Sequence, residues 1–445
     1  MVEFVILAAL FFGLFFISAN AEGLDYLSPS VVLPAVFFVC SLAAIYNSAL
    51  YGVEISWIAV LALLGTTALF SAVANLCSST VLRRGSYLDI RVKNAGFVPR
   101  EIEYSNVWLA VTVIYCCLVL LLYYRDLMRT FGSLGLAGDW NQNMNAYRFA
   151  SSFKELDEGE GISGMTNLLF KVETAITFVY MYVGVQDWVV GAKKRALPCF
   201  LPLLIHCVCV VLSAGRMGMI RVAFGFAAVA WVLWNANTGW SRRIKLSTIL
   251  KCLAAFLVAC VAFWVLGVAV GRQIDEGPFD YVASYIGYSM VLFSRFLDAG
   301  DFPANGLFGS ETFVGLYNFI GSHFGITDFV YTYHLEWQYF QGIQLGNVYT
   351  AYRYWLHDFG TVGMLIMATL YGVFYSVIYG KAKGYRKSDS LINYPLLMFS
   401  YFAYGVVLIP IKDCLCATEL VVTTPMVLII MYVMGRLLAS KQERI

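Results

Sequence analysis

Charged residues are scarce in this sequence. Only 13% of the 445 residues are Asp, Glu, Lys or Arg, whereas 60% are hydrophobic. Soluble domains carry about 25% charged residues, so the composition excludes a soluble globular protein. A net charge of only +2 also gives no reason to expect a nucleic-acid partner. The composition therefore predicts a multi-spanning membrane protein.

Cysteine is missing where a disulfide framework would need it. The chain has 11 cysteines, but none falls in the long polar segments 125–164 and 271–360. Most lie in or beside apolar runs, where cysteine behaves as a small hydrophobic residue. The sequence also lacks an Asp-x-Asp pair and a compact His/Asp/Glu cluster, and Cys414 with Cys416 alone is a poor ligand set. We therefore predict that the protein needs no metal ion and no other cofactor.

Apolar runs of membrane-spanning length recur along the whole chain. A helix needs about 20 apolar residues to cross the hydrocarbon core, and about eleven such runs are present. The predicted fold is all-α: one polytopic membrane domain over residues 1–445, with ten to twelve spans and a long external loop that carries short helices. The predicted spans are Val2–Ala19, Val31–Ala49, Ile55–Cys77, Val107–Tyr123, Thr166–Val189, Leu201–Ser213, Met219–Trp234, Ile249–Val270, Val362–Tyr379, Tyr394–Pro410 and Val421–Leu438.

Lysine and arginine cluster in alternate connections between these spans. Because cytoplasmic loops carry an excess of Lys and Arg, the clustered connections and the C-terminus are predicted to be cytoplasmic. The segments 125–164 and 271–360 are then external, and an odd number of spans places the N-terminus outside. The basic clusters are Arg83–Arg100, Lys193–Arg195, Arg242–Lys245 and Lys381–Lys387.

The external segment 271–360 is unusual in composition. Its 90 residues include no lysine, three arginines and nine acidic residues, and many of the others are aromatic. An aromatic ring stacks on the apolar face of a sugar while polar neighbours bind its hydroxyl groups, and Glu336–Gln341 with Trp337 and Tyr339 offers both. Membrane-interface anchoring is the alternative for any single aromatic residue. Tyr281–Leu297 is predicted to be a helix at, or dipping into, the interface.

Two arginines interrupt an otherwise apolar stretch. Arg216 is predicted to lie at a tight turn between two membrane helices, and Arg221 about one and a half turns into the second. Burying a guanidinium in a membrane costs about 2.5–3.5 kcal/mol on insertion scales, so an anionic partner is expected. Two interpretations stay open: an anion site reached from one membrane face, or a structural ion pair or snorkelling anchor.

The end of the long loop holds the sharpest cluster of candidate catalytic residues. If the chain is helical there, Tyr349, Arg353 and His357 recur at i, i+4 and i+8 and share one face. His357 beside Asp358 is a candidate general base, although contact between adjacent residues requires the helix to end, as Gly360 would allow. The alternative is that His357 and Asp358 only anchor the helix at the interface.

Together these residues describe a site for glycosyl transfer. Arginines bind a diphosphate leaving group at the outer leaflet and take the place of a metal ion. A histidine or carboxylate deprotonates a sugar hydroxyl, and aromatic residues hold the glycan. The predicted diphosphate ligands are Arg216, Arg221, Arg295 and Arg353, and the predicted glycan ligands are Tyr349, Trp337 and Tyr339.

The chain resembles the Wzy-type O-antigen polymerases (oligosaccharide repeat unit polymerases), which are relatives of the O-antigen ligases. The resemblance rests on the Ala214–Arg221 entry into a span, the long external loop that follows, and the closing segments Asn347–Thr350 and Asp358–Gly363. It covers roughly residues 201–379. It implies a membrane glycosyltransferase of GT-C type in the bacterial inner membrane, with its active site facing the periplasm.

The resemblance also implies a reaction. The family transfers a growing glycan from undecaprenyl diphosphate to the non-reducing end of a newly flipped lipid-linked repeat unit, with inversion and without metal. The implied partners are lipid-linked glycans, membrane lipid, and a chain-length regulator and a flippase of the same pathway. In the ligases the external-loop histidine precedes the closing Gly-rich segment by more residues than His357 does, so Asp358 and Glu336 remain rival bases.

Other functions stay open at this point. An O-antigen ligase would perform the same chemistry with lipid A core as the acceptor. A flippase or other transporter also needs intramembrane arginines but typically has repeated halves, and no internal repeat is visible. A non-catalytic scaffold or sensor would not need buried arginines together with an external aromatic loop.

We expect Arg216→Ala and Arg221→Ala each to abolish polymer formation, because each removes a guanidinium from the predicted diphosphate site. Lysine at either position should restore little, because a point charge cannot reproduce the bidentate guanidinium fork. Gel analysis of surface polysaccharide measures chain length directly. Full-length polymer in both alanine variants would exclude the diphosphate role of these residues.

Overall fold

The computed structural model describes residues 1–84, 97–153, 161–240, 277–300, 302–303, 306–329, 335–385 and 390–439, with six further residues between 261 and 268. Within these ranges eight helices are long and apolar enough to cross a membrane. The predicted class of multi-spanning α-helical membrane protein is therefore confirmed. The eight are α1 (Val2–Ala21), α2 (Pro29–Tyr51), α3 (Trp57–Arg84), α4 (Asn106–Ser133), α6 (Gly164–Val190), the continuous stretch from α7 to α8 (Lys193–Leu212), α9 (Arg216–Asn237) and α13 (Ala351–Lys383).

Shorter elements complete the described structure. Two apolar helices coincide with the last two predicted spans, whereas the predicted span Ile249–Val270 lies almost entirely outside the described residues. The one strand pair among the described residues is an antiparallel hairpin. The shorter elements are α5 (Trp140–Phe153), α11 (Pro278–Ala299), α12 (Val314–Phe324), β1 (Gln338–Phe340), β2 (Ile343–Gly346), α14 (Tyr394–Leu408) and α15 (Thr423–Ala439).

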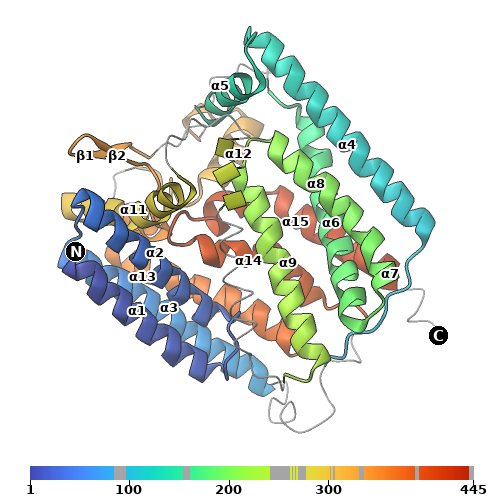
Figure 1. The fold of residues 1–445 in the computed structure, drawn as a ribbon, viewed down its shortest axis with the longest axis horizontal. Helices are drawn as coiled ribbons and strands as arrows, with labels where there is room; N and C mark the ends of the chain where they lie inside the picture. The colour runs from blue at the N-terminus through green and yellow to red at the C-terminus, as the bar shows by residue number, and fades with distance from the viewer. Residues whose placement is uncertain are drawn as a thin grey trace. The chain divides into compact units, whose positions relative to one another are not determined.

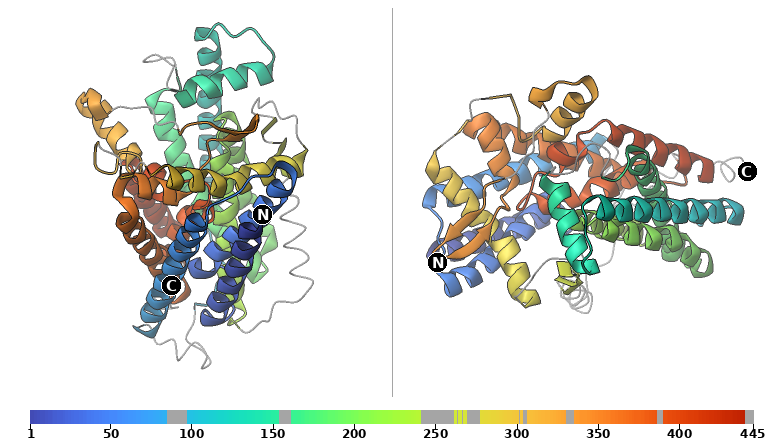
Figure 2. Two further views of the ribbon diagram at one scale, coloured as in Figure 1. Left: turned by 90° about the vertical axis from the view of Figure 1, so that its left-hand side faces the viewer. Right: turned by 90° about the horizontal axis from the view of Figure 1, so that it is seen from above.

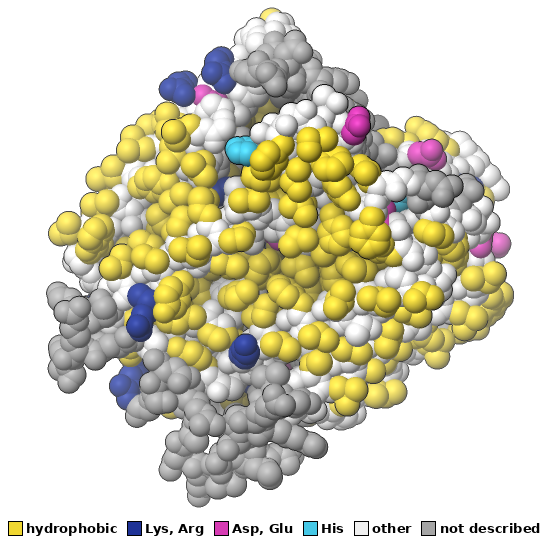
Figure 3. Space-filling view, turned by 180° about the vertical axis from the view of Figure 1, so that it is seen from behind, with side chains coloured by type: hydrophobic (Ala, Val, Ile, Leu, Met, Phe, Trp, Pro, Cys, Tyr) yellow, Lys and Arg dark blue, Asp and Glu magenta, His cyan; other side chains and the backbone are white. Residues whose placement is uncertain are grey.

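Hydrophobic side chains on the membrane helices are exposed rather than packed inward. Leu61 on α3, Leu121 on α4 and Ile429 on α15 are all exposed. Figure 3 shows one face of the molecule, on which hydrophobic side chains predominate and Lys and Arg are sparse. Such a surface is unfavourable in water and matches lipid, because lipid tails are as apolar as leucine. All nine described cysteines are free, as predicted.

The chain divides into two compact units. The first comprises Met1–Ser86, Phe279–Lys381 and Phe402–Thr424, and the second comprises Tyr87–Pro278, Ala382–Tyr401 and Pro425–Ile445. The first unit therefore contains α1–α3, α11, α12, the hairpin and most of α13. The second contains α4–α9, most of α14 and α15.

In the first unit, α11 crosses one end of the helices α1–α3, with the β1–β2 hairpin at the same end (Figures 1 and 2). Asn47, near the end of α2, donates a hydrogen bond of 2.9 Å to the Ala283 carbonyl oxygen. The contact needs glycine at position 287, because a Cβ there would lie 2.6 Å from Asn47 Nδ2. The prediction of a helix over Tyr281–Leu297 is confirmed, and α11 covers the end that the charge pattern places outside.

In the second unit, α5 covers the turn that contains Arg216. The segment 125–164, which the sequence predicts to be an external loop, includes the last turns of α4 and all of α5. Leu127 and Phe131 of α4 form one buried cluster with Met144 and Tyr147 of α5 and with Ala214, two residues before Arg216. Because these side chains exclude water, the arginine turn is fixed against the external segment.

The predicted basic connections of the second unit meet one another. Gln186 Nε2, at the end of α6, donates to the carbonyl oxygens of Arg100 at 2.7 Å and Leu391 at 3.2 Å. Arg195 forms an ion pair of 3.2 Å with Glu101. Three connections that the charge pattern places on the cytoplasmic side therefore lie at one end of this unit, as that orientation requires.

The orientation itself can be tested by labelling. Asn141 in α5 and Lys194 in α7 are both exposed, and the positive-inside rule places them outside and inside, respectively. We expect a membrane-impermeant maleimide to label Asn141→Cys in intact spheroplasts, and Lys194→Cys only after the membrane is permeabilised. Wild-type protein supplies the background of the native cysteines. Reversed labelling would invert the orientation, and labelling of both from one side would disprove the span assignment.

Candidate functional site

The first turns of α13 carry two of the three predicted catalytic residues, His357 and Asp358. The helix begins at Ala351, whose N–H donates to the Ile409 carbonyl oxygen at 2.7 Å. Tyr349 therefore precedes the helix, which corrects the expectation that it occupies the first position of a shared helical face. Arg353 and His357 do share that face. The guanidinium of Arg353 also lies 5.5 Å from the centroid of the Tyr349 ring, so the three residues still adjoin.

Gly360 interrupts α13, as the sequence predicted. Its backbone has φ 65° and ψ −172°, a region that is essentially restricted to glycine. Shortly before this break, the adjacent side chains of His357 and Asp358 contact each other. His357 Nδ1 lies 2.9 Å from Asp358 Oδ1. A carboxylate is only an acceptor, so this ring nitrogen carries the proton.

The Asp358 carboxylate is held by a turn that is remote in sequence. Its Oδ2 accepts hydrogen bonds from the backbone N–H groups of Thr312 at 2.6 Å and Glu311 at 3.1 Å. The Ser310 hydroxyl donates to Oδ1 at 3.4 Å. Asp358 therefore fixes the turn 310–312 against the head of α13, and its own position is determined by at least three donors.

That turn brings Glu311 to Arg353 and His357. Glu311 Oε2 forms an ion pair with Arg353, and Oε1 lies 3.3 Å from His357 Nε2. The Glu311 side chain is only 9% exposed and that of His357 18%. Sequence reasoning missed Glu311, although it is one of only nine acidic residues available in the external segment to pair with a buried arginine. The result is a compact cluster, the α13 cluster, of Glu311, Arg353, His357 and Asp358.

Aromatic rings surround the arginine of the α13 cluster. The Arg353 guanidinium lies 4.5 Å from the centroid of the Phe296 ring, on α11. A cation placed over an aromatic face is stabilised by about 0.5–2 kcal/mol. Burial raises the pKa of the Tyr349 hydroxyl, so this phenol stays neutral. It donates a hydrogen bond of 3.3 Å to the Glu336 carbonyl oxygen.

The segment that carries Glu336, Trp337 and Tyr339 forms the β1–β2 hairpin and its approach. Arg295, next to Phe296 on α11, donates to the Tyr339 carbonyl oxygen at 2.9 Å and thereby ties the hairpin to α11. The Trp337 and Tyr339 side chains are 46% and 58% exposed. These two predicted glycan ligands therefore present open aromatic surface. The Glu336 side chain is exposed as well, and its contact with Tyr349 is made by the backbone.

The other two predicted diphosphate ligands belong to the second unit. Arg216 is buried at the first position of α9, and Arg221 follows within the same helix, as the sequence predicted. Arg221 donates to the Tyr401 hydroxyl at 3.3 Å, and its guanidinium lies 4.9 Å from the centroid of that ring. Arg295 and Arg353 belong to the first unit. The convergence of all four arginines on one diphosphate remains a prediction.

The α13 cluster also has the spacing of a metal site. Glu311, His357 and Asp358 each offer one ligand atom, and these atoms lie within 4.8 Å of one another. Each donor atom already has another partner: Asp358 accepts backbone hydrogen bonds, Glu311 pairs with Arg353, and the His357 ring lies between the two carboxylates. A cation would also lie next to the Arg353 guanidinium, which repels it. With these partners, the cluster has groups that can transfer a proton and bind an anion.

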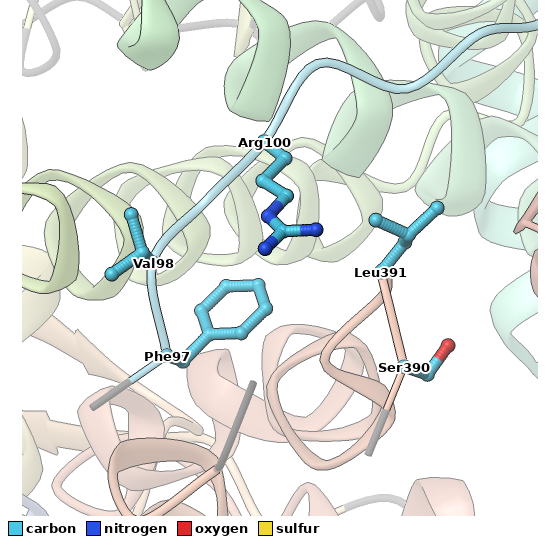
Figure 4. Close-up of a pocket in the computed structure, with 5 residues that line it drawn as sticks. All are labelled: Phe97, Val98, Arg100, Ser390 and Leu391. Carbon is cyan, nitrogen blue, oxygen red and sulfur yellow. The ribbon is translucent and has the colours of Figure 1, made fainter. Parts of the chain in front are cut away.

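A small pocket in the second unit is separate from the predicted site residues. Figure 4 shows its lining, which comes from the connection before α4 and the connection before α14: Phe97, Val98, Arg100, Ser390 and Leu391. Both connections belong to the predicted basic side.

No protein-family model, no curated protein and no solved structure matches this chain. The chemistry of the α13 cluster is therefore the main indication of function.

We expect Asp358→Asn to destabilise the protein by about 1–3 kcal/mol, because an amide nitrogen in place of one carboxylate oxygen leaves a buried donor without its acceptor. Thermal unfolding of the purified protein in detergent measures this change. Asp328→Asn is the matched control, because Asp328 is an exposed carboxylate of the same external segment. Equal unfolding midpoints for the two variants would show that the turn 310–312 does not depend on Asp358.

Proposed function

We propose that this protein is a glycosyltransferase that polymerises lipid-linked oligosaccharide repeat units at the outer face of the bacterial inner membrane. It transfers the growing glycan from undecaprenyl diphosphate to the non-reducing end of an incoming repeat unit. The acceptor hydroxyl attacks the anomeric carbon, the bond from that carbon to the diphosphate oxygen breaks, and the diphosphate leaves with the electron pair. A single displacement of this kind inverts the anomeric configuration.

The observation that carries the proposal is the α13 cluster beside an exposed aromatic hairpin. A guanidinium binds a diphosphate in bidentate fashion and neutralises charge that develops on a leaving group. A carboxylate and an imidazole within 3.3 Å of each other supply the base for a sugar hydroxyl. Exposed Trp337 and Tyr339 supply stacking surface for the glycan. Transfer between lipid-linked glycans needs all three functions.

Two buried carboxylates elsewhere in the chain, Asp25 and Asp126, do not favour a transporter. Asp25 accepts hydrogen bonds from the Tyr379 hydroxyl on both oxygens, at 2.9 and 2.8 Å. Asp126 accepts from the Thr166 hydroxyl at 2.7 Å, at the start of α6. Each carboxylate therefore stabilises a helix end through fixed donors, whereas an ion pathway needs groups that exchange partners.

The proposal includes the finer features of the family that the chain resembles. These are eleven spans, a GT-C type fold, a cytoplasmic C-terminus and reaction without a metal ion or cofactor. Lipid-linked glycans and membrane lipid are the proposed partners, together with a flippase that delivers repeat units and a regulator of chain length. An O-antigen ligase would use the same cluster with a different acceptor, so the product distinguishes the two.

A strain that lacks the gene tests the proposal. We expect lipid A core to carry single repeat units, because the flippase and the ligase still act. Purified protein mixed with undecaprenyl-diphosphate-linked repeat units from that strain should form polymer in excess chelator, since arginine takes the place of the metal ion. Long chains that stay unattached to lipid A would indicate a ligase, and the absence of external glycan would indicate a flippase. Strict dependence on Mg²⁺ or Mn²⁺ would show that the cluster carboxylates are metal ligands.

A further inference from the structure

The two ring nitrogens of His357 are both engaged in the α13 cluster. Nδ1 lies 2.9 Å from Asp358 Oδ1 and Nε2 lies 3.3 Å from Glu311 Oε1. Nδ1 donates its proton to Asp358, so Nε2 is the nitrogen that could accept another proton, and it faces the Glu311 carboxylate. Glu311 therefore occupies the position beside Nε2 that a sugar hydroxyl would need. This geometry argues against His357, the residue favoured by the sequence, as the direct base.

Glu311 is itself a group that can accept a proton. Its carboxylate pairs with Arg353 through Oε2 and lies beside His357 through Oε1, and an ionised carboxylate is only an acceptor. Its backbone N–H is held by Asp358 at 3.1 Å, so the side chain projects from a fixed turn. We propose, on the basis of the proposed function, that Glu311 is the catalytic base that deprotonates the acceptor hydroxyl, and that His357 and Asp358 are positioning residues for it.

The step balances with the groups present. The acceptor oxygen forms a bond to the anomeric carbon while its proton passes to a Glu311 carboxylate oxygen. The bond between the anomeric carbon and the diphosphate oxygen breaks, and the electron pair leaves on the diphosphate. No oxidant, reductant or further reactant is consumed. The acidity of the hydroxyl rises as the new bond forms, so the carboxylate is basic enough for the transfer.

Arg353 links this base to the bound donor. Its guanidinium is a fork of five N–H donors, and in the structure it pairs with Glu311 Oε2. A diphosphate that binds Arg353 competes with Glu311 for those donors. As the guanidinium turns toward the diphosphate, Glu311 loses part of a positive neighbour and becomes a stronger base. Donor binding thereby activates the group that deprotonates the acceptor.

Chemical rescue separates this role from a structural one. Azide is already anionic and attacks an anomeric carbon without a base. We expect Glu311→Gln to lower polymerisation by about 10²- to 10⁴-fold, the usual contribution of a general base. Azide should then restore release of undecaprenyl diphosphate from the purified donor and yield a glycosyl azide. Arg353→Gln should show no rescue, because the leaving group remains unstabilised. Asp328→Asn, an exposed carboxylate of the same segment, should behave as wild type.

A double variant gives an independent measure. If Glu311 and His357 act as one unit, Glu311→Gln with His357→Gln should lose little more activity than Glu311→Gln alone. Multiplied losses would show that the two residues act separately and would overturn the positioning role of His357. Folding is checked by thermal unfolding and by retained binding of the lipid-linked donor.

Two results would overturn the assignment of Glu311 while leaving the proposed function intact. One is wild-type polymerisation by Glu311→Gln, and the other is a folded, donor-binding Glu311→Gln protein that azide does not rescue. Rescue of Glu336→Gln instead would place the base on the approach to the hairpin. If wild-type protein neither forms polymer nor releases undecaprenyl diphosphate, the proposed function fails, and the assignment of Glu311 fails with it.

Discussion

The candidate site depends on one interaction, the acceptance of backbone hydrogen bonds by Asp358. The turn 310–312 lies more than forty residues before Asp358 in the sequence, and its Thr312 and Glu311 N–H groups donate to Asp358 Oδ2. This contact fixes the backbone of Glu311, whose side chain then pairs with Arg353 and lies beside His357. The same carboxylate also contacts His357 Nδ1 through Oδ1 and thereby orients the imidazole.

The opposite side of α13 is fixed independently. Successive helical residues are separated by 100°, so Trp355 points away from the face that carries Arg353 and His357. Trp355 Nε1 donates to Asp413 Oδ2 at 2.8 Å, and the Tyr371 hydroxyl donates to Oδ1 at 2.5 Å. Burial raises the pKa of Asp413, while these two hydrogen bonds act in the opposite direction. Because Asp413 holds the opposite side of α13, the helix has little freedom to rotate about its axis. The face that carries Arg353 and His357 therefore keeps its position.

Some of this site was readable from the sequence because it is local. The shared face of Arg353 and His357 follows from helical spacing, and the contact between His357 and Asp358 and the break at Gly360 were expected from the glycine nearby in the sequence. Glu311 could not be found this way, because its contacts span more than forty residues and lie in no motif. The β1–β2 hairpin was also missed: its strands are only three and four residues long, too short for a clear alternating pattern.

The second unit contains a similar pair that serves as a comparison. His206 Nδ1 lies 3.0 Å from Glu173 Oε2, between α8 and α6, and the two side chains are 3% and 0% exposed. Pairing alone therefore does not define a site, because a fully enclosed pair has no surface on which a substrate can exchange a proton. His357 and Glu311 have the same chemistry with 18% and 9% exposure, next to an arginine and an open aromatic hairpin. Access and a neighbouring arginine, rather than an unusual residue type, distinguish the α13 cluster as the site for the proposed glycosyl transfer.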